Sequence, residues 1–182
     1  MLESSLDLSA DGRIELYKDR MGSGMKGELH LTGLSLTAVP PSLASLHGMN
    51  NLKELYLAHN KLSTLPEHVT QLSSLEKLDL TSNVLAELPP AIGSLARLKS
   101  LHLSRNRLQR LPDAIGELQQ LVWLDLRCNA LASVPTEALS TMQELATLWL
   151  DGNPCAGSDE VAAGVSGTML ATGVSVVGCL ER

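Results

Sequence analysis

The chain has 182 residues, of which 44% are hydrophobic and only 2% aromatic, and its net charge is −6. This composition argues against disorder, a mildly acidic chain is a poor general binder of nucleic acid, and no apolar run approaches the roughly 20 residues that span a bilayer. Leu alone supplies 38 residues and Phe none, which favours a periodic architecture with a leucine-filled core.

Residues 1–25 are expected to cap one end of the molecule. They carry scattered acidic residues and no apolar h-region, so we expect no secretory signal here. The pair Asp11-Gly12 is a hairpin signal and predicts a β-hairpin over about residues 6–17, with its apolar side chains on one face. The alternative is a degenerate repeat, because Leu6 and Leu8 resemble the leucine pair of the repeats that follow.

A glycine-rich stretch, Gly22 to Gly27, follows this capping segment. It is similar to a phosphate-binding loop but lacks the full GxxxxGK[ST] spacing, and no strand–loop–helix context supports that function. We interpret it as a flexible join. The chain also contains no GxSxG, HExxH, CxxC or kinase signature, so the sequence predicts neither an enzyme nor a cofactor site.

Residues 26–154 contain about six repeats of the pattern LxxLxLxxNxLxxLPxxIxxLxx. An upstream unit from Lys26 is about three residues longer and has Leu34 in place of Asn. A fixed period of this length is typical of a solenoid, whose units bury their apolar faces against one another. The other units start 23, 23, 23 and 24 residues apart, at Leu52, Leu75, Leu98, Leu121 and Leu145.

Each part of the pattern predicts a local structure. The alternating LxxLxL part predicts a short parallel strand whose Leu side chains face the core. The following Asn is expected to satisfy backbone groups in a turn and to stack with its counterparts along the array. The Pro column fixes φ near −65°, and the xxIxxL spacing predicts a short helical turn on the outer side.

These in-register units resemble the leucine-rich-repeat family, and their LPxxIxxL half is most similar to the intracellular Ras-group type. The resemblance implies a right-handed α/β repeat solenoid with a short-stranded parallel concave sheet and a 3₁₀, short-helix or extended convex side. It also implies capped ends. In this family the solenoid binds other proteins, usually on the concave sheet, and the resemblance implies no particular partner.

Residues 155–182 depart from the pattern and are expected to form a C-terminal cap. Ser158 with two following acids resembles a helix N-cap and predicts a helix over about residues 159–171, which Gly164 and Gly167 weaken. Residues 174–177 are interpreted as a last strand. The alternative is a loosely ordered tail.

The chain has three cysteines, Cys128, Cys155 and Cys179. An odd count without a secretory signal predicts reduced thiols and a cytoplasmic location. A Cys155–Cys179 bridge is the alternative for an exported chain. The wide spacing of the three residues argues against a zinc site.

Strand positions that face away from the core supply the candidate site. Adjacent strands lie about 4.8 Å apart, so equivalent positions form rows across the concave face. The third-position row reads Glu28, Glu54, Lys77, Ser100, Trp123 and Thr147, and the fifth-position row reads His30, Tyr56, Asp79, His102, Asp125 and Trp149. The edge of this face is expected to carry His59, Ser82, Arg105 and Cys128 at the eighth position and Arg127 at the seventh.

The neighbours Asp79, His102 and Asp125 admit three interpretations: a metal or acid–base site, a solvated polar row, or part of a partner-recognition surface. We expect no bound metal. In each case the two carboxylates are expected to raise the pKa of His102.

Three of the four aromatic residues fall at concave positions, and Trp, Tyr and Arg are enriched at interface hot spots. For Trp149 the alternative is packing beneath the C-terminal cap. The candidate partner-binding residues are Tyr56, His59, Asp79, His102, Arg105, Trp123, Asp125, Arg127 and Trp149.

The sequence therefore predicts a non-catalytic module that binds a protein partner on its concave face, as an adaptor or scaffold in signal transduction. We expect no nucleic acid or membrane partner, and a monomer rather than a homodimer. One alternative is the recognition subunit of a kinase, phosphatase, GTPase or ubiquitin-ligase complex, or a pathogen effector. Another is a structural homodimer through the sheet or its C-terminal edge.

Overall fold

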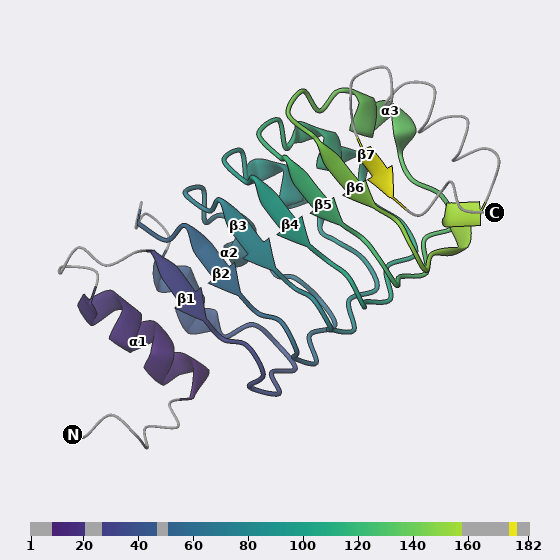
Figure 1. Ribbon diagram of the computed structural model, residues 1–182. Coiled ribbons are helices and arrows are strands. Elements are labelled where there is room, and N and C mark those ends of the chain that lie inside the picture. Colours follow the sequence, from purple (N-terminus) through teal and green to yellow (C-terminus); the bar gives the residue numbers. More distant parts are fainter. Residues whose placement is uncertain (1–8, 21–26, 47–50, 158–174, 178–182) are drawn as a thin grey trace.

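The computed structural model describes residues 9–20, 27–46, 51–157 and 175–177. Figure 1 shows short strands side by side in one sheet, the short helices behind it, and helix α1 (Ala10–Arg20) at the N-terminal end. Within the described ranges, no helix has the length and apolar character needed to cross a membrane.

The sheet contains seven parallel strands in chain order among the described residues. Each strand pairs with the next so that equivalent repeat positions face each other, for example Leu78 opposite Leu101. The strands are β1 (Glu28–His30), β2 (Glu54–Tyr56), β3 (Lys77–Asp79), β4 (Ser100–His102), β5 (Trp123–Asp125), β6 (Thr147–Trp149) and β7 (Ser175–Val177). This register confirms the predicted solenoid, because a slip of one residue would turn every central Leu to the opposite face.

One continuous core runs along the stack, as predicted. Each strand from β1 to β6 contributes its central Leu and the Leu two residues later, and both Leu101 and Leu103 are fully buried. Each repeat unit forms one coil of the solenoid. The outer half of each coil contributes the paired apolar residues of xxIxxL, such as Ile115 and Leu118, which are also fully buried. The core is therefore aliphatic and is built from the same positions in every coil.

The predicted asparagine stack connects successive coils. The side chain of Asn106 donates from Nδ2 to the carbonyls of Leu103 in its own coil (3.0 Å) and Leu80 in the preceding coil (2.9 Å). Its Oδ1 accepts the N–H of Leu85, also in the preceding coil, at 3.0 Å. Equivalent bonds form at Asn60, Asn83, Asn129 and Asn153. Each buried amide thus satisfies backbone groups of two coils that the sheet does not pair.

The residue before each of these asparagines adopts a left-handed backbone, which the sequence analysis did not predict. Its N–H donates to the seventh-position carbonyl of the next coil, as from Arg105 to Arg127 at 2.8 Å. These backbone hydrogen bonds hold a conformation that costs a non-glycine residue about 1–2 kcal/mol. The φ angles are 55° at His59, 56° at Ser82 and Arg105, 54° at Cys128 and +71° at Gly152. Gly33, at the equivalent position of the first unit where Leu34 replaces Asn, also has a φ of +71°.

The convex side consists of short helical turns that begin after an extended proline, as predicted. Pro89 and Pro112 have φ of −67° and −70° and lead directly into these turns. Gly116 lies so close to the next coil that a Cβ there would sit 2.6 Å from the carbonyl oxygen of Ala138. The turns are η2 (Pro41–Leu46), α2 (Glu67–Thr70), η3 (Pro90–Ser94), η4 (Asp113–Glu117), α3 (Thr136–Ser140) and η5 (Pro154–Gly157).

The N-terminal β-hairpin predicted over residues 6–17 is wrong, because helix α1 occupies this segment from Ala10 onward. The hydroxyl of Ser9 accepts the N–H of Gly12 at 3.3 Å and so caps the helix, and Gly12 belongs to the first turn. The helix buries Ala10, Ile14 and Tyr17, which follow helical rather than alternating spacing. The alternative repeat at Leu6 and Leu8 lies outside the described residues.

At the C-terminal end, β7 pairs with β6 and confirms the predicted last strand over Ser175–Val177. The helix predicted over residues 159–171 lies outside the described residues. Cys155 is buried. Cys179, its partner in the alternative disulfide bridge, lies outside the described residues, so that bridge stays a prediction.

Candidate functional site

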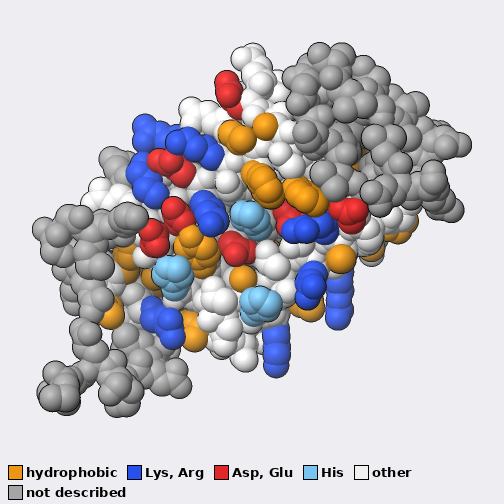
Figure 2. Space-filling model, viewed as in Figure 1, with side chains coloured by type: hydrophobic (Ala, Val, Ile, Leu, Met, Phe, Trp, Pro, Cys, Tyr) orange, Lys and Arg blue, Asp and Glu red, His pale blue; other side chains and the backbone are white. Residues whose placement is uncertain are grey.

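The concave face carries the two predicted rows of side chains. The sheet register places His102 between Asp79 and Asp125, and places Trp149 next to Asp125. Figure 2 shows this face, where charged, histidine and hydrophobic side chains gather in a mixed patch over the strands. The strand pairing therefore confirms how these residues are arranged, while their role in binding stays a prediction.

In the N-terminal half of this face, polar groups satisfy one another around Tyr56. Its ring stacks on that of His30, with centroids 4.5 Å apart. Its hydroxyl donates to the carboxylate of Glu54 and accepts from Nζ of Lys77 at 3.3 Å. The hydrogen bond to Glu54, and then burial, raise the pKa of Tyr56. This half is thus a closed hydrogen-bonded cluster.

In the middle of the face, His102 differs from the sequence-based expectation. Burial lowers its pKa below the ordinary value of 6.5, and this effect outweighs the charges of Asp79 and Asp125. Lys77 and Arg127 oppose those carboxylates. The predicted rise in the His102 pKa is therefore wrong, because the ring is too far removed from water and cations face it as well.

Next to His102, a buried carboxylate is paired with an arginine. Asp125 is 3% exposed and accepts hydrogen bonds from Nε of Arg127 at 2.9 Å and Nη2 at 2.7 Å. Burial alone would raise the pKa of Asp125, but the side-chain and backbone hydrogen bonds from Arg127, together with its charge, hold that pKa below its usual range. The two-point contact fixes the orientation of the guanidinium.

Beyond this pair lie the two tryptophans. The rings of Trp123 and Trp149 are 5.9 Å apart and tilted by 34°, and the guanidinium of Arg127 lies 4.6 Å from the Trp149 ring centroid. Both rings are partly exposed. Neither Nε1 finds an acceptor among the described residues, although both atoms are buried. This half of the face is therefore aromatic and leaves two donors unpaired.

The predicted edge residues lie beside the sheet rather than on its floor. Arg105 and His59 are exposed and have the left-handed backbone described above. Arg105 is next to Arg127 in the neighbouring coil, whereas His59 lies in the second coil, next to the Tyr56 cluster. The structure thus brings Arg105, Asp125, Arg127 and both tryptophans together and leaves Tyr56 and His59 apart from them.

Two neighbouring features were not foreseen. Val122, beside Trp123, is 40% exposed and adds apolar surface. Arg107 and Lys61, which directly follow Asn106 and Asn60, are also exposed.

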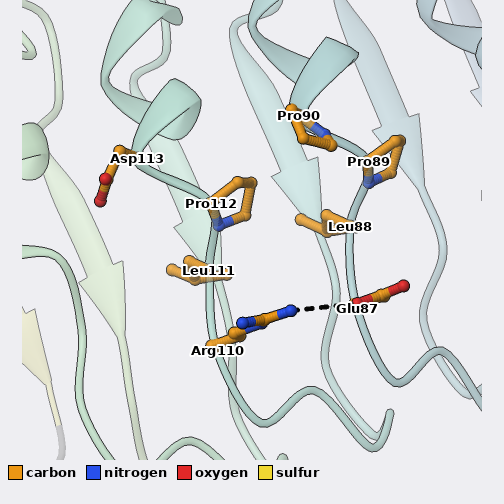
Figure 3. Close-up of a pocket in the computed structure, with 8 residues that line it drawn as sticks. All are labelled: Glu87, Leu88, Pro89, Pro90, Arg110, Leu111, Pro112 and Asp113. Carbon is orange, nitrogen blue, oxygen red and sulfur yellow. Dashed lines mark ion pairs between the residues drawn. The ribbon is translucent and has the colours of Figure 1, made fainter.

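A separate pocket of about 340 Å³ opens on the outer side between the third and fourth coils. Figure 3 shows prolines along its walls and an exposed ion pair between Glu87 and Arg110, at 3.6 Å. Its lining residues are Glu87, Leu88, Pro89, Pro90, Arg110, Leu111, Pro112 and Asp113. None of the residues proposed for partner binding lines it.

The predicted row does not assemble a metal-binding set. In the parts of the chain that the structure describes, no group of three or more His, Cys, Asp or Glu side chains is arranged to hold a metal ion. Asp125 is also committed to Arg127. The row therefore consists of a half-buried histidine beside a buried carboxylate that is paired with an arginine.

Comparison with known proteins agrees with this architecture. A model of a leucine-rich repeat region matches residues 29–162. A solved leucine-rich-repeat protein of Leptospira interrogans aligns with a TM-score of 0.57 and 28% sequence identity, over 78% of this chain. The alignment spans 40% of that protein's chain, so the present chain corresponds to less than half of it. No curated protein matches. The finer resemblance to the Ras-group type stays a prediction.

Proposed function

This chain belongs to the leucine-rich-repeat family, whose members are interaction modules, and from that premise we propose that it binds a protein partner on its concave face. The module itself is non-catalytic in this proposal and serves as an adaptor or scaffold in signalling. The partner contacts the half of the sheet around Trp123, Trp149 and Arg127.

The observation that carries this proposal is the position of the tryptophans. The chain has only two, and both lie on adjacent strands of one face, partly exposed and next to an oriented arginine. Trp and Arg are the residues most enriched at interface hot spots.

The size of the face supports the same proposal. Strands lie about 4.8 Å apart, so β1 to β6 span about 24 Å. That length accommodates a contact of about 800 Å² on each partner, which is the standard size of a specific interface. A single protein segment can therefore be bound by this sheet alone.

The test is to replace both tryptophans and measure recovery of partners. Trp123→Ala with Trp149→Ala should abolish the capture of a specific protein by the immobilised full chain. Neither ring belongs to the leucine core, so the far-UV circular dichroism and the thermal midpoint should change little. Quantitative mass spectrometry of the captured proteins gives the readout.

The matched control carries Glu137→Ala and Glu144→Ala, two exposed changes away from the concave sheet. It should capture the same protein as the parent chain. Equal capture by the tryptophan variant would contradict the proposal. Sedimentation at micromolar concentration should give a monomer, and a stable dimer lost in the tryptophan variant would instead favour a homodimer through this face.

A further inference from the structure

We propose that the partner presents an acidic segment, whose carboxylates lie along the edge formed by Arg127, Arg105 and Arg107 while an apolar side chain packs on the tryptophan pair. This inference rests on the proposed function and specifies the chemistry of its partner. The edge formed by the three arginines is called the basic rim below.

The first support is the unused part of the Arg127 guanidinium. The group has five N–H donors, and Asp125 engages one on Nε and one on Nη2. Three donors remain, and the side chain is 42% exposed. Because Asp125 and the Trp149 ring fix its orientation, Arg127 presents a preformed fork that suits a second carboxylate.

The second support is Arg105 in the preceding coil, together with Arg107 two residues further along the chain. The N–H of Arg105 donates to the carbonyl of Arg127 at 2.8 Å, which places the two residues on adjacent coils. Arg105 and Arg107 are both exposed, and neither forms an ion pair with any residue in the described ranges. Their charges are therefore available to a partner.

The opposite edge of the sheet, at the amino ends of the strands, provides a comparison. There Glu76 lies between two lysines, with Lys53 Nζ at 3.3 Å and Lys99 Nζ at 2.8 Å. These lysines are partly neutralised from within the chain, whereas the basic rim has only Asp125, which is buried, and Asp151 near Arg127. Among the described residues, the basic rim combines two arginines that form no ion pair, Arg105 and Arg107, with an arginine that lies over the Trp149 ring.

The net charge of the whole chain argues against an extended polyanion as the partner. At a net charge of −6, the chain repels extended polyanions such as nucleic acid or an anionic membrane. A short acidic segment meets only the local positive field, which is screened beyond about 8–10 Å at physiological salt. The apolar rings next to the rim further favour a segment that carries both acidic and apolar side chains.

The experiment selects ligands from a random peptide library displayed on phage. The immobilised full chain is the bait, and the Trp123→Ala, Trp149→Ala variant is used to remove peptides that bind elsewhere. We expect the selected peptides to be enriched in Asp and Glu around an aromatic or aliphatic residue. Their affinity, measured by fluorescence anisotropy with synthetic peptide, should fall steeply as salt increases.

Arg105→Glu with Arg107→Glu should weaken a selected peptide about tenfold, the equivalent of about 1.4 kcal/mol. The control, Arg97→Glu with Arg110→Glu, makes the same change in net charge at exposed sites away from the basic rim and should leave the affinity within about twofold. Circular dichroism verifies that both variants fold.

The outcomes separate this inference from the proposed function. Peptides that need the tryptophans but lack acidic enrichment and ignore the charge reversal would overturn the acidic partner and leave the proposed function standing. A selection that yields no tryptophan-dependent peptide would overturn both. Tighter binding of single-stranded DNA or of phosphatidylserine vesicles, with the same sensitivity to the charge reversal, would contradict a protein segment as the source of the negative charge.

Discussion

The two faces of each strand differ sharply. Toward the interior, the central residue of β1 to β6 is Leu in every coil, and each is at most 3% exposed. Toward the concave side, the fifth-position row runs from histidine and tyrosine through aspartate and histidine to aspartate and tryptophan. The interior repeats leucine in every coil, whereas this row never places the same residue type on adjacent strands.

This difference separates stability from recognition. The interior must repeat because each coil packs on two neighbours of the same shape. The concave side chains line an open face instead of the shared interior, so their types are free to vary. They form a closed polar cluster around Tyr56 and an incompletely satisfied aromatic cluster around Trp123. The second cluster contains two buried indole N–H groups that have no acceptor among the described residues.

The largest effect is expected from the interior. Leu101→Ala removes a fully buried side chain from the middle of the stack and should cost roughly 2–5 kcal/mol of unfolding free energy. Urea unfolding measures it. A loss below about 1 kcal/mol would contradict the burial of this row and hence the distinction between the two faces.

The asparagine stack should come next. Asn106→Ala leaves the buried N–H of Leu85 and two carbonyls without their partner, and each such group costs about 1–3 kcal/mol. We expect a total loss of at least about 2 kcal/mol in the same urea assay. The exposed Gln109→Ala is the control. Equal stability of the two variants would mean that water replaces the amide freely.

An intermediate effect is expected where the concave side touches the interior. Arg127→Leu should destabilise the fold by roughly 1–3 kcal/mol at neutral pH, because it leaves the carboxylate of buried Asp125 without its cation. In the parent chain the lowered pKa of Asp125 stabilises the fold above the unfolded-state pKa, and this contribution is lost as pH falls through the folded-state pKa.

In the Arg127→Leu variant, burial raises the pKa of Asp125, so stability should instead fall as pH rises through the acidic range. Unfolding free energies measured between about pH 3 and about pH 7, a range that includes the usual carboxyl pKa of about 4, test this reversal. Combining Arg127→Leu with Asp125→Asn should remove this pH dependence, because no carboxylate remains at position 125. An unchanged pH profile would show that Arg127 does not control this carboxylate.

The smallest effect concerns His102. The pKa of His102 in the folded state lies below its ordinary value of 6.5, which applies to the unfolded chain. As pH falls, the unfolded chain therefore binds the proton first, and the free energy of unfolding decreases between the unfolded-state and folded-state pKa values. An NMR titration of the ring should give a midpoint below that of a histidine in a short unstructured peptide. A midpoint at or above the peptide value would mean that Asp79 and Asp125 outweigh burial.

Most of the fold was predictable because a periodic array repeats its signal. The leucine, asparagine and proline columns each predicted a local structure that the structure confirms. The same repeat frame also predicted the strand register that places Asp79 opposite His102. The N-terminal cap was mispredicted because Asp11-Gly12 has two structural contexts. In isolation it favours a hairpin, but Ser9 provides a helix cap and Ile14 and Tyr17 provide helical spacing.

The site was predictable as a set of positions but not as a set of contacts. The repeat frame placed both tryptophans on adjacent strands, yet the two-point contact between Asp125 and Arg127 depends on side-chain rotamers that spacing does not specify. The left-handed column was also missed, although glycine at both of its ends, Gly33 and Gly152, was a usable signal.

The most direct test of recognition by the concave side uses the two tryptophans themselves. Because the chain contains no others, fluorescence excited at about 295 nm reports only on this face. When a captured partner or a selected acidic peptide is added, we expect the emission to shift and acrylamide quenching to decrease. Saturating binding that leaves both emission and quenching unchanged would contradict the account.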